Sequence, residues 1–404
     1  MAVQETTRTS YGQRVTGSVK GIGGGLILLI LGTALLWWNE GRAVKTSKML
    51  DRAEKIAVEM EDISAVNPEF DGKLVHATGV AVTLDTLADK LFGISENAIK
   101  LDREVEYFQV QETSSSKTKD KIGGGKETVT TYEYKNGWSP VRINSSEFKD
   151  EKYHGSNFVL NDAESESWEA ANVSFGAYRL PPELIGSISG DKPIELSLPE
   201  DLVKALNKTA ATIKKDTAAL LAQTALSEYK YVHVSGNVLY IGEDSMNPQV
   251  GDVKITFTKV LPEQTVSILA KVSGDTFQKH VDKNGKTLEA LSVGAKGMDE
   301  MFSAKRSSNK FWTWILRLIG FLIIFAGLKS LFDVVVSILK VIPLLANIAN
   351  LAMSVILGVL AFAWSLLVIA LAWLFYRPVL GVLLLAVAAG ALIFFSLKGK
   401  GESA

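Results

Sequence analysis

The chain has 404 residues, 22% of them charged, a formal net charge of −1 and no cysteine. Without cysteine there are no disulfides, thiolate zinc sites or cysteine nucleophiles. A near-neutral charge without a basic block argues against nucleic acid as a partner. The average composition combines two unlike parts, because a few long apolar runs are almost free of charge while the rest of the chain is polar. This division predicts an α-helical membrane protein with a large water-exposed domain.

The first apolar run predicts a membrane-spanning helix at residues 21–38, after a short N-terminus at residues 1–20. A helix needs roughly 20 apolar residues to cross the hydrocarbon core of a bilayer. The run ends in two tryptophans followed by Asn39 and Glu40, and this end offers no small-residue cleavage site. We therefore interpret the run as an uncleaved anchor and not as a signal peptide.

Three glycines in this region follow one another at the spacing of a helical turn: Gly17, Gly21 and Gly25. Small residues at this spacing let a second helix approach closely in lipid. The pattern predicts a helix-packing seam against the C-terminal helices or a second copy. A flexible, glycine-rich entry into the membrane is the alternative.

Residues 39–310 are predominantly polar and predict an α+β domain with an antiparallel sheet. Residues 104–112 and 127–134 are β-rich runs that flank a serine run and a glycine run, which is typical of a long hairpin with a flexible tip. The spacing of apolar residues predicts a helix at residues 201–226. Further β-rich runs follow at residues 229–241, 253–260, 265–272 and 276–281.

The last quarter of the chain predicts three more spans, which gives a 1+3 arrangement of four transmembrane helices. An amphipathic stretch between the second and third spans is too short to cross alone, so we place it in the interface plane. A three-residue turn separates the last two spans, which are expected to form a tight antiparallel pair. The segments are residues 311–328 (second span), 329–350 (interfacial amphipathic helix and loop), 351–375 (third span), 379–397 (fourth span) and 398–404 (cytosolic tail).

Arg317 is a charge inside the second predicted span. An intramembrane charge is a functional hypothesis by default. A long side chain so near the end of a helix also reaches the membrane surface by snorkelling. We favour snorkelling, because a transporter or proton relay needs several such charges.

Four spans place both termini on the same side of the membrane. Basic residues flank the spans about equally on the two sides, and a long domain can be translocated regardless of its charge. The residues alone therefore leave the orientation open.

Several segments, spread over nearly the whole chain, carry a distinctive pattern. They are Trp38–Val44, Lys73–His76, Val105–Gln109, Tyr132–Trp138 with Asn144, Ser145 and Phe148, Gly251–Val253 and Trp373–Pro378. In order and in content these segments resemble the LUMA family, also called the transmembrane protein 43 family. The 1+3 span layout is similar as well, so the resemblance does not depend on a single motif.

The resemblance implies a topology and a role. Animal members of the family are four-span proteins of the inner nuclear membrane and endoplasmic reticulum, with the large domain in the lumen and both termini outside it. They self-associate, bind other membrane proteins and are regarded as organisers rather than enzymes. The short N-terminus, the absence of cysteine and the Lys-Gly-Lys tail favour a bacterial source. There the protein would lie in the inner membrane, with residues 39–310 in the periplasm.

The candidate site consists of four residues that this topology places at one membrane surface: Trp38, Glu40, Arg42 and Arg377. We predict an ion pair between Glu40 and Arg377, shielded by aromatic rings, that fixes the domain to the helices. Arg42 is then expected to face the domain or the lipid headgroups. The alternative is an aromatic belt with ordinary charged flanks.

The predicted function is that of a non-enzymatic scaffold that self-associates and organises membrane protein complexes. The expected partners are the lipid bilayer, further copies of the chain and other membrane proteins, and no cofactor or metal is expected. The four histidines are far apart in the sequence, and no nucleophile elbow, P-loop or dinucleotide motif is present. A small oligomeric ion channel or transport accessory subunit is the first alternative, and a membrane-tethered hydrolase is the second.

Overall fold

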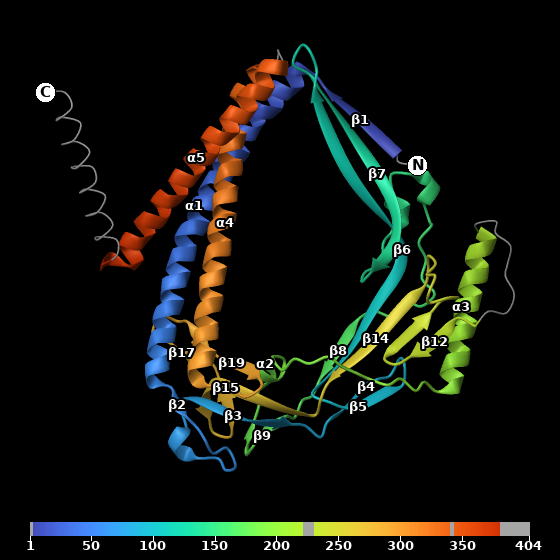
Figure 1. Ribbon diagram of the computed structural model, residues 1–404, viewed down its shortest axis with the longest axis vertical. Helices are drawn as coiled ribbons and strands as arrows, with labels where there is room; N and C mark the ends of the chain where they lie inside the picture. Colours follow the sequence, from blue (N-terminus) through green and yellow to red (C-terminus); the bar gives the residue numbers. More distant parts are fainter. Residues whose placement is uncertain (1–2, 221–229, 340–342, 380–404) are drawn as a thin grey trace.

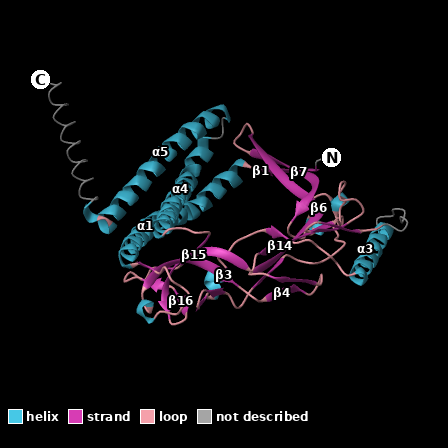
Figure 2. Ribbon diagram, turned by 60° about the horizontal axis from the view of Figure 1, so that its bottom comes forward, coloured by secondary structure: helices cyan, strands magenta, loops and turns pink. Residues whose placement is uncertain are grey.

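Three long helices form a bundle on one side of the molecule, and a sheet-rich domain lies on the other (Figure 1). The structure is a computed structural model that describes residues 3–220, 230–339 and 343–379. A second view shows the bundle and the strands as separate parts, with helix α3 (Glu200–Leu220) at the far end of the sheets (Figure 2). The helices of the bundle are α1 (Tyr11–Ile56), α4 (Met298–Leu339) and α5 (Pro343–Tyr376).

Each bundle helix contains a stretch that is long and apolar enough to cross a membrane. The three stretches lie in Tyr11–Ile56, Met298–Asp333 and Ala352–Tyr376, where the first three spans were predicted. The fourth predicted span, at residues 379–397, lies outside the described residues except for Val379. Residues 329–339 continue α4 without a break, and the interfacial position of residues 329–350 stays a prediction.

The middle of the bundle exposes large apolar side chains. A surface of this kind is unfavourable in water and favourable against the hydrocarbon of a bilayer. We call this zone the apolar belt and define it as residues 19–38 of α1, 311–332 of α4 and 355–375 of α5. The exposed apolar residues of the belt include Leu26, Ile27, Ile30, Leu31, Leu318, Leu322, Val359, Phe362 and Leu366.

Helices α1 and α4 run antiparallel and approach closely along a seam of glycines. A Cβ atom on Gly25 would lie 2.9 Å from the carbonyl oxygen of Gly327, and one on Gly32 would lie 3.1 Å from that of Gly320. Gly25 and Gly32 are seven residues apart on α1, and Gly320 and Gly327 are seven residues apart on α4. The two close contacts are therefore separated by two helical turns. The seam therefore depends on the absence of side chains at four positions.

The predicted glycines take different places relative to this seam. Gly25 lies in it, and Gly21 adjoins it, because the hydroxyl of Ser330 donates a hydrogen bond of 2.9 Å to the Gly21 carbonyl. Gly17 lies outside it, since a Cβ there would meet nothing within 4 Å. The helix that packs against these glycines is α4 of the same chain.

The domain contains two large sheets. The first has the strand order β1-β7-β6-β14-β13-β12, with β8 paired to β6 and β11 paired to β14. Its strands are antiparallel, as predicted. They are β1 (Val3–Thr9), β6 (Lys100–Asp120), β7 (Lys126–Ser139), β8 (Glu166–Glu169), β11 (Lys192–Pro193), β12 (Val232–Ser235), β13 (Val238–Ile241) and β14 (Val253–Val260).

The second sheet has the order β19-β15-β16-β10-β9-β3-β2, and a further pairing of β15 with β3 closes five of its strands into a ring. Only the β10–β16 and β2–β3 pairs of this sheet are parallel. The strands are β2 (Val58–Glu59), β3 (Leu74–Val82), β9 (Ser174–Phe175), β10 (Tyr178–Arg179), β15 (Glu263–Ser273), β16 (Thr276–Gln278) and β19 (Ala290–Val293).

Smaller elements complete the described part of the domain. Helix α3 packs its apolar face on the core of the first sheet, and its described part begins close to the predicted start of that helix. The remaining elements are β4 (Thr86–Asp89), β5 (Ile94–Asn97), β17 (His280–Val281), β18 (Thr287–Leu288), α2 (Pro182–Ile185), α3 (Glu200–Leu220) and the 3-10 helices η1 (Pro68–Phe70), η2 (Ser145–Glu147) and η3 (Glu151–Tyr153).

The predicted long hairpin is confirmed as the pair β6–β7, and it is longer than expected. Its outer part, residues 108–138, extends beyond the contact of β6 with β14 and reaches the N-terminal end of α1 (Figure 1). We call residues 108–138 the arm. Strand β1 pairs with β7 along the arm, from Val3 opposite Tyr132 to Thr9 opposite Lys126. This pairing joins two segments that were predicted to lie on opposite sides of the membrane.

The other end of the domain packs against the bundle below the apolar belt. Met49, Leu50 and Ala53 of α1 form one apolar core with Met301 and Phe302 of α4, and Leu74, Leu269, Leu288 and Ala290 of the domain. Arg306 of α4 binds Glu54 and Asp51 of α1, and Arg52 of α1 binds Asp282 in the turn between β17 and β18. We call this contact the base junction.

Replacing Gly25 with Ala is expected to destabilise the bundle by about 1–3 kcal/mol, because the added methyl group would overlap the Gly327 carbonyl and Leu331. Gly17→Ala is the matched control, since open space surrounds that position and Ala favours a helix by up to about 1 kcal/mol over Gly. Denaturation of both variants in detergent measures the difference. Equal losses would contradict the close contact.

Acid is expected to weaken the base junction. The Arg52 guanidinium lowers the pKa of Asp282 to about 2 in the folded protein, against roughly 3.9 for an unfolded aspartate. The ion pair therefore stabilises the fold above about pH 4, and this contribution is lost as the pH falls toward about 2. Unfolding curves of the parent and Asp282→Asn should converge over this window, and a constant gap between them would contradict the assignment.

Candidate functional site: a buried polar cluster in the helix bundle

A group of polar side chains is buried between the three helices at the end of the apolar belt nearest the base junction. Asn39 and Glu40 of α1 are fully buried there, although the flanking Trp38 is 56% exposed. The chain changes from apolar to polar at this level of α1, so a buried acid and amide require partners from the neighbouring helices.

Glu40 has three hydrogen-bond donors from two other helices. Arg317 of α4 binds both carboxylate oxygens, with Nε 2.6 Å from Oε1 and Nη2 2.9 Å from Oε2. The indole of Trp373 on α5 donates a third bond of 2.7 Å to Oε2. Glu40 is 1% exposed, and the side chain of Arg317 is 18% exposed. Bidentate, charge-assisted bonds of this kind are among the stronger side-chain contacts in proteins.

The partner predicted for Glu40 is wrong, since its carboxylate binds Arg317 and not Arg377. The antiparallel seam of α1 and α4 sets this outcome, because it brings Arg317, about two turns inside the second predicted span, level with Glu40. Arg377 instead places its guanidinium 5.9 Å from the ring centre of Trp373. The guanidinium of Arg317 is held by Glu40 and lies 4.9 Å from the Trp314 ring, and the snorkelling of this side chain to the membrane surface stays a prediction.

Arg42 makes a second polar contact between α1 and α4. Its guanidinium donates to the side-chain oxygens of Asn39, Asn309 and Thr313. The amide of Asn39 in turn donates a bond of 3.0 Å to the Thr313 carbonyl. Arg42 was expected to face the domain or the headgroups. It faces α4 instead, because Asn309 and Thr313, one turn apart on α4, both accept hydrogen bonds from its guanidinium.

Close packing fixes α5 against the same level of α1. A Cβ atom on Gly41 would lie 2.7 Å from the Tyr376 ring, so glycine is required for this approach. The Trp37 ring packs 6.0 Å from the rings of both Phe375 and Tyr376. The predicted site therefore divides: Glu40 and Arg42 lie inside the cluster, while Trp38 faces outward and Arg377 lies at its edge.

Four residues of the site were not among those predicted: Asn39, Asn309, Thr313 and Trp373. Asn309, Thr313 and Arg317 are spaced four residues apart, which places them on one face of α4. That spacing was the available signal. The cluster as a whole links three helices through one buried ion pair and the amides around it.

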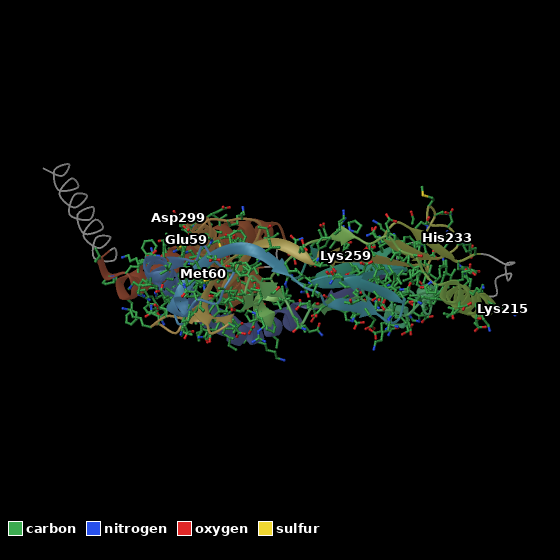
Figure 3. All side chains as sticks on the ribbon, turned by 90° about the horizontal axis from the view of Figure 1, so that it is seen from below. Glu59, Met60, Lys215, His233, Lys259 and Asp299 are labelled. Carbon is green, nitrogen blue, oxygen red and sulfur yellow. The ribbon has the colours of Figure 1, made fainter. Side chains whose placement is uncertain are left out.

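The histidines do not form a site. His76 bonds to Glu59 and a backbone carbonyl, and His154 and His233 each bond to a backbone carbonyl. Figure 3 labels Glu59 and His233 near opposite ends of the molecule. Within residues 3–220, 230–339 and 343–379, no group of three or more His, Asp or Glu side chains is arranged to hold a metal ion.

Comparison with known proteins finds one family and no similar solved structure. The model of the family described as Transmembrane protein 43 matches residues 107–378. Transmembrane protein 43 of Homo sapiens is 28% identical over 96% of this chain and 92% of its own length. The Rattus norvegicus protein is 28% identical over 92% of this chain and 88% of its own length. The Drosophila melanogaster homolog is 26% identical over 92% and 93%. No solved structure matches the chain significantly.

Breaking the Glu40–Arg317 pair is expected to cost about 3–5 kcal/mol, because removal of one partner leaves a buried charge unpaired. Glu40→Gln, Arg317→Gln and the double variant form a cycle in which the double variant should lose less than the sum of the single losses. Denaturation in detergent provides the measurement, and Arg377→Gln is the control that should change stability little. Additive losses would show that the two side chains do not interact.

Proposed function

The chain belongs to the transmembrane protein 43 family, and on this basis we propose that it is a non-enzymatic membrane scaffold. It self-associates through its membrane helices and organises other membrane proteins around its sheet-rich domain. The observation that carries the proposal is the closed polar cluster, in which Glu40, Arg317 and Trp373 bind one another across three helices. Groups engaged in this way fix helix positions and are not free to relay protons or ions.

The base junction supports the same role. Its apolar core and its ion pairs connect α1 and α4 directly to strands of the domain. A domain held in this way keeps a fixed position relative to the membrane surface, as a scaffold requires. Partners would then bind a domain surface whose distance from the membrane and whose orientation are fixed.

The proposed location is the inner membrane of a bacterial cell, with the body of the domain in the periplasm and both termini in the cytosol. Family membership and the apolar belt support the membrane location, while the bacterial source and the orientation are part of the proposal. It includes residues 379–397 as a fourth span, which returns the C-terminus to the side of the N-terminus. The partners are lipid, further copies of the chain and other membrane proteins, without a cofactor.

Self-association is tested with two differently tagged copies in one cell. Membranes are cross-linked before solubilisation, and capture through one tag should recover the second tag in stoichiometric amount. Arg317→Gln is expected to reduce this recovery, because the helix arrangement depends on its ion pair, whereas Arg377→Gln should retain it. Recovery of one tag alone would refute a self-associating scaffold.

The same preparations separate the alternative functions. Purified protein in liposomes should pass no ions, and an ion flux that Arg317→Gln abolishes would favour the channel. A scaffold should also retain a second membrane protein in stoichiometric amount after cross-linking. An unrelated tagged membrane protein, expressed to the same level, controls for capture by aggregation.

A further inference from the structure

The tip of the arm is fixed to the N-terminal end of α1 by specific contacts. Arg14 forms an ion pair with Asp120, and their side chains are only 8% and 14% exposed. Arg14 also donates to the Gly124 carbonyl. The Tyr11 ring packs so closely on Gly124 that a Cβ would not fit there. The arm tip and the end of α1 are therefore complementary in charge, through Arg14 and Asp120, and in shape, through Tyr11 and Gly124.

Strand β1 strengthens the same contact. Its pairing with β7 covers seven residues, and Arg8 binds Glu127 while Tyr132 donates a bond of 3.1 Å to Glu5. A cavity of about 400 Å³ at this place is lined by residues of α1, β7 and α4, including Lys126 and Ser330. The arm therefore adjoins both α1 and α4 at the end of the bundle that is opposite the base junction.

The domain thus contacts the bundle at both ends of the apolar belt. The base junction involves Met49 and Leu50, and the arm tip involves Tyr11 and Arg14, while the belt begins at residue 19 and ends at residue 38. The chain connects these two contacts through β6 and β7, outside the bundle (Figure 1). The arm must therefore pass the level of the bilayer.

The arm is unsuited to lipid. Residues 113–119 of β6 are exposed on both faces and read Thr-Ser-Ser-Ser-Lys-Thr-Lys. In the described part of the chain, residues 111–120 of β6 pair on one side only, with β7, whereas the other side of Phe108 bonds to Gly251 and Asp252 and that of Val110 to Asn157. Strand β1 likewise pairs only with β7. Open strand edges and polar side chains do not occur against hydrocarbon, because their polar groups would lack partners.

We propose that copies of this chain assemble with their bundles toward the lipid and their arms packed together at a shared centre from which lipid is excluded. The occupant of each open arm edge is a second copy of the chain. Strands β1 and β6 are both antiparallel to β7 and therefore run in the same direction. The β1 edge of one copy thus meets the β6 edge of the next without inverting either copy in the membrane. Such a head-to-tail contact closes into a ring when the rotation fits.

This inference rests on the proposed self-association and adds the surface that performs it. The arm supplies both edges, and the apolar belt supplies the face toward lipid. A ring of this kind leaves no polar strand in contact with hydrocarbon. It also explains why β1 and the arm tip share one side of the membrane.

The absence of cysteine allows single-cysteine variants of the full chain without other changes. Ser116→Cys reports on the arm, Thr6→Cys on β1 and Ser64→Cys on the body of the domain, and all three positions are exposed. The variants are labelled with a membrane-impermeant maleimide in native membrane vesicles of both orientations. Ser116→Cys should be labelled from the side that labels Thr6→Cys, and additional labelling from the opposite side is also compatible with the proposal. Ser64→Cys should be labelled only from the opposite side.

A bifunctional maleimide should give covalent dimers from Ser116→Cys and none from Ser64→Cys, the matched control. A lipid-confined quencher should reach a fluorophore on Ile27→Cys in the belt but not one on Ser116→Cys. Labelling of Ser116→Cys only from the Ser64 side, or quenching by the lipid probe, overturns the ring of arms. If two-tag capture succeeds in that case, self-association stands and only this inference fails, whereas failure of capture removes both.

Discussion

The antiparallel contact of α1 with α4 is the constraint on which the rest of the structure depends. Four glycines allow the backbones of the two helices to come into direct contact. The register of this contact aligns Glu40 with Arg317. The buried ion pair would be costly without that alignment, because each charge would be removed from water without a partner. Packing and electrostatics therefore act together here: the seam positions the charges, and the ion pair stabilises the register in which they meet.

The same two helices determine where the domain lies. Below the apolar belt they provide Met49, Leu50, Met301 and Phe302 to the base junction. Above it, the first turn of α1 receives the arm through Arg14 and Tyr11. A domain attached at two distant points of one helix pair cannot turn freely about either of them. Its orientation relative to the membrane is thus a property of the bundle.

The polar groups buried in the helix bundle bear directly on function. Glu40, Arg317, Trp373, Asn39 and Arg42 all find their partners within the bundle. That closed arrangement favours a structural role in each copy, as expected of a scaffold in the transmembrane protein 43 family. The exposed polar arm is the feature that a single copy in lipid does not account for, and the proposed association of copies would resolve it. Under that proposal the buried cluster holds one chain together and the arm joins several.

The sequence by itself identified three candidate spans, which lie in Tyr11–Ile56, Met298–Asp333 and Ala352–Tyr376, because a bilayer selects on length and apolar character. It also determined the hairpin and the antiparallel sheets, whose signals are local. Only the tertiary structure decided that Arg317 pairs with Glu40, 277 residues away, and that β1 pairs with β7. It likewise added Gly32, Gly320 and Gly327 to the seam. These contacts depend on the register between helices and strands distant in sequence, which no local pattern of residues encodes.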